Sequence, residues 1–307
     1  MRDAAFRWTF FIVALFALGP VAYWLTANLR APDGFTQVEP ILAQTGAATG
    51  VLRGCGAILL SAVVLALTAR FISMRWAFLC AGATLAWGAA GAGRIDELLR
   101  LTPDRALLWQ VALEGAIFAA LLVACVRGAS WWVARLPVQG AGTPAAISAP
   151  GDSFWRTRLD SVPPGHRDTH APIEESSERW MRVGASIAIA VSAGMAVAWF
   201  VALSTLKGQT LAAAVIGAVA TGIITGMLHK QAPAWVLLAG FAVLAVAAPA
   251  LGALTLPRDP AALLTMVNAG PMAPPARVVP LDWLAGALIG LPIGSKWGVG
   301  LVTAERA

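Results

Sequence analysis

Charged side chains are scarce in this sequence, because Asp, Glu, Lys and Arg make up only 12% of its 307 residues. An average soluble domain carries about twice that fraction. Hydrophobic residues reach 58%, and the mean hydropathy is +0.73. These values exclude an ordinary soluble domain and direct the search to segments long enough to cross a membrane.

Cysteine and histidine are also rare, at three residues each. Cys55, Cys80 and Cys125 all lie in apolar runs, so no disulfide framework and no zinc spacing can be built from them. His166 and His170 are four residues apart, which is a weak pattern for a metal site. Prolines bracket this pair, and a solvated loop is the stronger interpretation. We therefore predict buried thiols, no metal and no cofactor.

Catalytic motifs are missing as well. The sequence has no GxSxG elbow, no Walker A loop and no dinucleotide-binding glycine fingerprint. Few Asp, Glu or His residues lie near any apolar run. No catalytic residue is proposed from the sequence, and an enzyme is the less favoured interpretation.

The sequence does contain eight long apolar runs, each close to the ~20 residues that a transmembrane helix needs. Unbroken runs of this length predict helices, since the strands of a membrane barrel alternate over about ten residues. The expected fold class is an all-α integral membrane protein with a bundle of about eight transmembrane helices. The runs cover residues 8–28, 54–72, 76–93, 106–126, 183–206, 210–228, 234–256 and 283–302. The third run is the shortest, and Pro20 is expected to kink the first, which we interpret as an uncleaved span.

The runs divide four and four around a polar segment. We expect an N-terminal membrane half at 1–126, a partly flexible cytoplasmic linker at 127–182 and a C-terminal membrane half at 183–307. At the end of the linker, Glu175 and Glu178 each lie four residues before an arginine, which favours a juxtamembrane helix that continues into the fifth run.

Two short helices are expected between the runs. One covers 94–101, where acidic and basic residues alternate with leucines. The other covers 259–270, with Asp259 as its N-cap, Pro260 at its first position and Gly270 as its stop. The second helix is apolar in its middle, so it either lies on the membrane surface or packs over the bundle.

The 22 basic residues are unevenly distributed over this predicted topology. With the N-terminus inside the cell, thirteen lie on the inner side, eight lie on the outer side and Lys296 lies inside a span. This positive-inside bias places both termini in the cytoplasm. The formal charge of +6 therefore reflects topology and not a nucleic-acid partner. The Arg-rich, Lys-poor composition is typical of a GC-rich prokaryote, so we predict a location in the inner (plasma) membrane.

Glycines form a stripe along the last run. They occupy every fourth position, at Gly286, Gly290, Gly294 and Gly298. Gly222 and Gly226 repeat the spacing in the sixth run. Helices in a bilayer associate by close backbone contact, which glycines permit. We expect a helix-packing seam within the chain, of the glycine-zipper kind; a homodimer interface is the alternative.

Three polar residues inside predicted spans form a candidate intramembrane polar site: Gln110, Glu114 and Lys296. Gln110 and Glu114 lie one turn apart on one helix face, and Glu114 is the only acidic residue deep inside a span. A lone carboxylate in hydrocarbon stays protonated or finds a partner. We hypothesise a Glu114–Lys296 ion pair; the alternative is that Lys296 reaches to the nearby membrane surface.

Three functions from different classes fit these observations. The leading hypothesis is a non-enzymatic scaffold or accessory subunit of a membrane assembly, because packing signals are rich and polar chemistry is sparse. The alternative is a small-molecule or ion transporter with Glu114 and Lys296 at its pathway. A second alternative is a lipid-handling enzyme that acts through Asp96 and Glu97. The expected partners are the lipid bilayer and either another membrane protein or a second copy of the chain.

Overall fold

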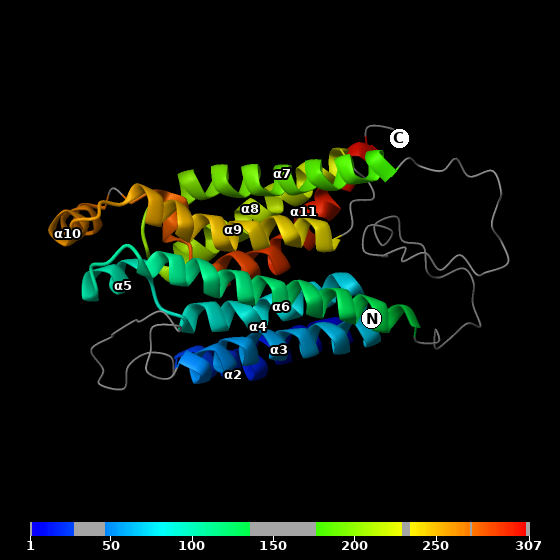
Figure 1. Cartoon of the computed structure of the whole chain (residues 1–307). Helices are drawn as coiled ribbons and strands as arrows, with labels where there is room; N and C mark the ends of the chain where they lie inside the picture. The colour runs from blue at the N-terminus through cyan, green and yellow to red at the C-terminus, as the bar shows by residue number, and fades with distance from the viewer. Residues whose placement is uncertain (1, 28–46, 136–175, 229–233, 271, 305–307) are drawn as a thin grey trace.

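The computed structural model describes residues 2–27, 47–135, 176–228, 234–270 and 272–304. These residues form helices joined by turns with no strand among them, so the described part of the chain is all-α, as the sequence predicted. The long helices run side by side as a bundle (Figure 1). In chain order the elements are α1 (Arg2–Val13), the π-helical turn η1 (Ala14–Leu18), α2 (Gly19–Ala27), α3 (Ala47–Phe71), α4 (Met74–Gly91), α5 (Ile95–Leu101), α6 (Leu107–Arg135), α7 (Ser176–Val201), α8 (Lys207–Leu228), α9 (Ala234–Thr255), α10 (Pro260–Ala269), the 3₁₀ turn η4 (Pro274–Arg277) and α11 (Pro280–Ala304).

The two ends of the bundle differ in character. The short helices α5 and α10 lie at one end, which we call the loop end (Figure 1). The start of α1 and the end of α11 both lie at the opposite end, which we call the terminal end. Consequently α6, α8 and α11 run from the loop end to the terminal end, and α7 and α9 run back.

Within the described residues, seven helical segments are long and apolar enough to cross a membrane, which makes this a multi-pass membrane protein. They are Ala4–Ala27, Gly50–Phe71, Leu107–Trp132, Trp180–Val201, Lys207–Leu228, Ala234–Thr255 and Pro280–Val302. Each coincides with one of the eight predicted runs. The remaining run, 76–93, forms α4, which has only 18 residues and is not among the seven.

The position of α4 explains its weak apolar signal. It packs against α2, α3 and α11, and most of its residues from Ala77 to Gly91 are buried. Its glycines allow close approach, because a Cβ added at Gly82 would lie 3.0 Å from the backbone N of Ile289 in α11. A helix that contacts protein on most sides needs small side chains for packing more than bulky apolar ones for lipid.

The first span is interrupted where the sequence predicted a kink. Pro20 lacks an N–H, and the chain widens into the π-helical turn η1 just before it, with the N–H of Gly19 donating to the carbonyl of Ala14. The same carbonyl accepts a hydrogen bond from Thr84 Oγ1 of α4 at 3.3 Å. A side chain from a neighbouring helix thus supports the backbone at the irregular turn.

The glycine stripe of α11 lies against α8. A Cβ added at Gly286 would lie 2.5 Å from the Cβ of Ala214, and one added at Gly294 would meet the backbone of Val219. From the other side, a Cβ at Gly222 would lie 2.7 Å from the backbone N of Ser295. The full set of glycines at this interface is Gly222, Gly226, Gly286, Gly290, Gly294 and Gly298. The two backbones touch over about three turns, so these glycines are packing residues within one chain.

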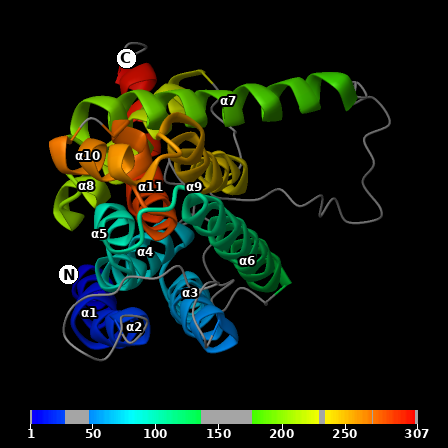
Figure 2. The same cartoon turned by 60° about the vertical axis from the view of Figure 1, so that its left-hand side comes forward.

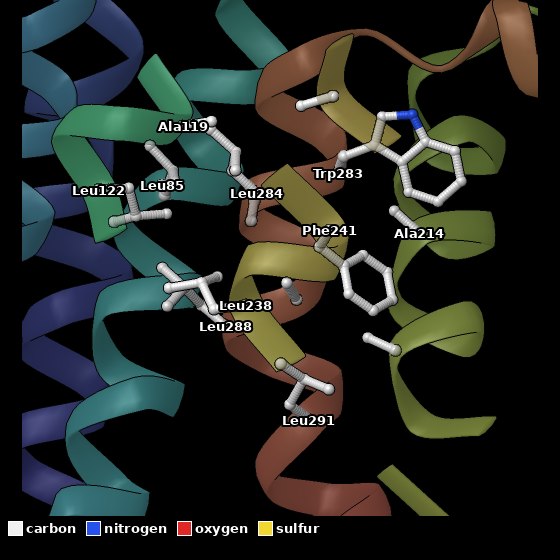
Figure 3. Close-up of a cluster of buried hydrophobic side chains, with 14 of the residues drawn as sticks. Leu85, Ala119, Leu122, Ala214, Leu238, Phe241, Trp283, Leu284, Leu288 and Leu291 are labelled. Carbon is white, nitrogen blue, oxygen red and sulfur yellow. The ribbon is translucent and has the colours of Figure 1, made fainter. Parts of the chain in front are cut away.

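The opposite face of α11 supplies the centre of the hydrophobic core. Leu284, Leu288 and Leu291 are buried, and Figure 3 shows them between the N-terminal helices on one side and α9 on the other. Trp283 and Phe241 extend toward α8, with ring centroids 6.1 Å apart. Viewed from the second direction, α11 lies between α4, α8 and α9 (Figure 2).

The loop end is closed by the predicted helix over 259–270. In α10 the Asp259 side chain accepts from the N–H of Ala262, and Gly270 ends the helix with a positive φ of 84°. Leu263 and Val267 of this helix join Ile95 of α5 in one buried apolar cluster. The expected caps are therefore confirmed, and α10 packs over the bundle.

Candidate functional site

Glu114 and Gln110 lie in α6 close to the loop end. Glu114 is only 7% exposed. Its neighbour Gly115 fixes its depth, because a Cβ added there would lie 3.1 Å from Cγ of Pro280, the first residue of α11. One turn further along the face of Glu114, the ring of Phe118 packs over Gly54 of α3. Glu114 therefore faces α3 at the depth of the first turn of α11.

Lys296 lies in α11, near the terminal end of that helix. It follows Pro280 by sixteen residues, which is about 24 Å along a helix axis. The lysine is exposed on the outside of the bundle, next to Trp297, which is 57% exposed. The structure thus corrects the expected Glu114–Lys296 pair, because the separation in depth is too large for a lysine side chain to span. Lys296 is placed to reach the membrane surface at the terminal end.

A different pair of charges meets at the loop end. The Nζ atom of Lys207, the first residue of α8, lies 3.4 Å from Oδ1 of Asp282 in the first turn of α11. Thr210 Oγ1 donates a hydrogen bond to the other carboxylate oxygen at 2.8 Å. Asp282 is fully buried, and the first turn of a helix favours a carboxylate. This contact joins the loop ends of the two helices that share the glycine interface.

Arg277 holds three segments together at the same end of the bundle. It lies in η4 and is 8% exposed. One guanidinium nitrogen donates to the carbonyl oxygens of Ala202, at 3.1 Å, and of Leu203, and the other donates to that of Gly270. Burial lowers the pKa of Arg277, while the charge of Asp96 raises it. The buried cation thus satisfies carbonyls at the ends of α7 and α10.

Asp96 is the third buried charge at this end. Arg94 donates to both of its carboxylate oxygens, at 3.1 and 2.7 Å, and Arg100 lies 3.7 Å away. Burial alone would raise the pKa of Asp96, but hydrogen bonds from Arg94 and Thr205, together with the charges of both arginines, outweigh it and hold the pKa below its ordinary value. Glu97 lies 3.4 Å from Arg94.

These contacts form one assembly, which we call the loop-end network: Arg94, Asp96, Lys207, Thr210, Arg277 and Asp282. Its members use one another and the nearby carbonyls as partners, and the turn between α7 and α8 lies at its centre. Its contacts join α8 to α11, η4 to the ends of α7 and α10, and α5 to the turn between α7 and α8. The network has a structural role, because each of its charged groups forms an ion pair or a hydrogen bond with another group of the protein.

The part of the chain that the structure describes contains no cluster of metal-ligating residues, and its three cysteines are free thiols. No group of three or more His, Cys, Asp or Glu residues there could hold a metal ion. His166 and His170 lie outside the described residues. Cys80 is buried, and Cys55 and Cys125 are half-buried, with no disulfide among them. An apolar groove of about 180 Å³ lies at the loop end, lined by Trp199, Thr255, Leu256, Met266, Met272, Ala273 and Pro274.

Sequence reasoning missed the Lys207–Asp282 pair and the role of Arg277. Asp282 and Lys207 each lie at the start of an apolar run on the same predicted side of the membrane, and this shared position was the available signal. The pairing depends on α8 and α11 being neighbours, although α9 and α10 separate them in the chain. Only the matching glycine spacings of the two runs hinted at that adjacency.

Comparison of the chain with protein-family models, with curated proteins and with solved structures gives no match.

Proposed function

We propose that this protein is a non-enzymatic subunit or scaffold of a membrane assembly, which holds a transmembrane helix of another membrane protein against α7. The observation that carries the proposal is the composition of the exposed face of α7. Small residues lie there at every fourth position, and all of them are exposed: Gly184, Ala188, Ser192 and Ala196. Among the described residues, no atom outside the helix itself lies within 4 Å of a Cβ placed at Gly184.

This face resembles an interface more than a lipid-contacting surface. Small residues at this spacing let two helix backbones approach closely in a bilayer, and a hydroxyl among them can hydrogen-bond across the contact. The chain uses the same four-residue spacing where α11 packs on α8. By contrast, the exposed face of α3 carries bulky side chains, namely Leu52, Leu59, Val63 and Leu67.

The proposal includes eight membrane crossings, with α4 as the eighth. Supporting contacts lie at both ends of this helix, where it runs beside the first span. The rings of Trp8 and Trp76 lie 5.7 Å apart toward the terminal end, and those of Tyr23 and Trp87 lie 6.2 Å apart toward the loop end. A helix that accompanies a membrane span over this length passes through the same depth of bilayer. Together with the predicted charge bias, this favours cytoplasmic termini in a prokaryotic inner membrane.

Native mass spectrometry of the protein in lipid nanodiscs tests the docking proposal. We expect wild-type protein to co-purify with a second polypeptide at fixed stoichiometry. The double variant Ala188→Leu/Ala196→Leu should lose at least about tenfold of it, because bulky side chains keep the helices apart. Ala120→Leu, the same change at an exposed position of α6, is the matched control and should retain the partner.

Three outcomes are informative. A partner of the same mass as the chain identifies a homodimer through the α7 face. Retention of the partner by Ala188→Leu/Ala196→Leu moves the interface elsewhere and contradicts the proposal. A wild-type chain that carries only lipid also contradicts it.

A further inference from the structure

The terminal end of α6 carries a row of alternating basic and aromatic side chains. Arg127, Trp131 and Arg135 are spaced four residues apart and are all exposed, so they follow one face of the helix. Trp235, at the start of α9, lies beside them. We call these four residues the Arg–Trp row. The membrane-crossing part of α6 ends at Trp132, so the row straddles the edge of the bilayer.

Both arginines stack on indole rings. The guanidinium carbon of Arg127 lies 5.5 Å from the ring centroid of Trp235, and that of Arg135 lies 3.7 Å from the ring centroid of Trp131. Stacking holds a guanidinium by its face and leaves the N–H donors at its edge available. Arg135 stacks on a residue one turn earlier, so its charge lies closer to the bilayer than its own backbone position.

In the part of the chain that the structure describes, no carboxylate is paired with the arginines of the Arg–Trp row. Within the described residues, neither Arg127 nor Arg135 forms an ion pair, and Glu114, far along the helix, is the only acidic residue of α6. α9 has none. The carbonyl end of the α6 dipole attracts the two cations but does not neutralise them. The row is therefore a fixed positive patch beside aromatic rings at membrane-surface depth.

We infer that the Arg–Trp row binds the headgroup of an anionic phospholipid. Lipid phosphates lie at this depth, the edge of a guanidinium matches two phosphate oxygens, and tryptophan is favoured at the level of the headgroups. Basic groups at the ends of transmembrane helices recognise anionic headgroups in the same way. This inference does not depend on the proposed docking at α7.

Lipid titration of the full chain tests the inference. Purified protein in a neutral detergent is titrated with phosphatidylglycerol or with phosphatidylcholine, and bound lipids are counted by native mass spectrometry. Wild-type protein should prefer phosphatidylglycerol. Arg127→Gln/Arg135→Gln should weaken this binding by roughly 30-fold, from about a factor of five for each surface cation. The matched control Arg258→Gln, which removes an exposed arginine at the loop end, should bind like wild type.

Further arms separate the alternatives. Arg127→Lys/Arg135→Lys keeps both charges but loses the planar guanidinium groups. Its affinity for phosphatidylglycerol should therefore fall between those of wild type and Arg127→Gln/Arg135→Gln. Wild-type protein should lose its preference for phosphatidylglycerol at high ionic strength. This measurement does not depend on whether a variant folds. The inference is overturned if wild type shows no preference for the anionic lipid, if Arg127→Gln/Arg135→Gln retains it, or if millimolar inorganic phosphate displaces the lipid.

Discussion

The buried charge of Asp282 depends on one lysine. Lys207 and Thr210 are its side-chain partners. Removing one member of a buried pair strands the other charge, which is strongly destabilising, whereas replacing both with apolar residues is often tolerated. We predict that Lys207→Met lowers the free energy of unfolding by about 3 kcal/mol. Lys207→Met/Asp282→Leu should recover most of this loss.

Thermal melting in detergent measures the effect. Lys296→Met is the matched control, because Lys296 is exposed, and it should change stability by less than about 0.5 kcal/mol. Asp282→Leu is measured as the second single variant. If the loss of stability in Lys207→Met/Asp282→Leu equals the sum of the losses in the two single variants, Lys207 and Asp282 are not coupled.

Asp96 makes stability sensitive to acid. Its pKa lies below the ordinary 3.8, because the bonds and charges around it outweigh its burial. A carboxylate with a lowered pKa stabilises the folded state above its unfolded-state pKa, and this contribution disappears as pH falls through the folded-state pKa. The melting temperature of wild type should therefore drop below about pH 4, and Asp96→Asn should be less stable at neutral pH but drop less on acidification. Equal acid sensitivity of the two proteins would show that Asp96 does not contribute.

At the scale of helices, two glycines of α11 differ in their surroundings: Gly294 lies in the interface with α8, and Gly300 does not. A Cβ at Gly294 would meet the backbone of Val219, which cannot move away as a flexible side chain can. At Gly300, by contrast, no atom of the described residues lies within 4 Å of an added Cβ. Gly294→Ala should destabilise the protein by about 1–3 kcal/mol through overpacking. Gly300→Ala should be neutral or slightly stabilising, since alanine favours helix. Melting temperatures compare the two, and a tolerated Gly294→Ala would contradict the close backbone contact.

The features of single helices that the sequence predicted, namely helix caps and a glycine stripe, follow from local rules of helix geometry. The caps of α10, Asp259 and Gly270, follow from backbone chemistry within one helix. The stripe from Gly286 to Gly298 follows from helical periodicity alone. Pairings between helices do not follow from either rule. Depth counted from the ends of the runs suggested a Glu114–Lys296 pair, but the true depth of Glu114 is set by tertiary packing beside Pro280.

At the scale of the whole molecule, the role of α4 decides the topology. If α4 crosses the bilayer, the α3–α4 turn and the end of α5 lie on opposite sides. In a chain whose three cysteines are replaced by alanine, Ser73→Cys should react with a membrane-impermeant thiol reagent from one side only and Thr102→Cys from the other. Inside-out and right-side-out vesicles provide the two measurements. Labelling of both positions from the same side would show that α4 does not cross.

The adjacency of α8 and α11 also has a consequence in time. The ribosome synthesises α8 first, and about 70 further residues must follow Gly226 before Gly298 can pack against it. At roughly 5–20 residues per second, this interval lasts on the order of 4–14 seconds. During this interval α11 and Asp282 are not yet available to the small-residue face of α8 and to Lys207. The nascent chain can then form non-native helix contacts or be degraded by quality-control proteases. The helix α11, synthesised after α8 and α9, thus completes the centre of the bundle.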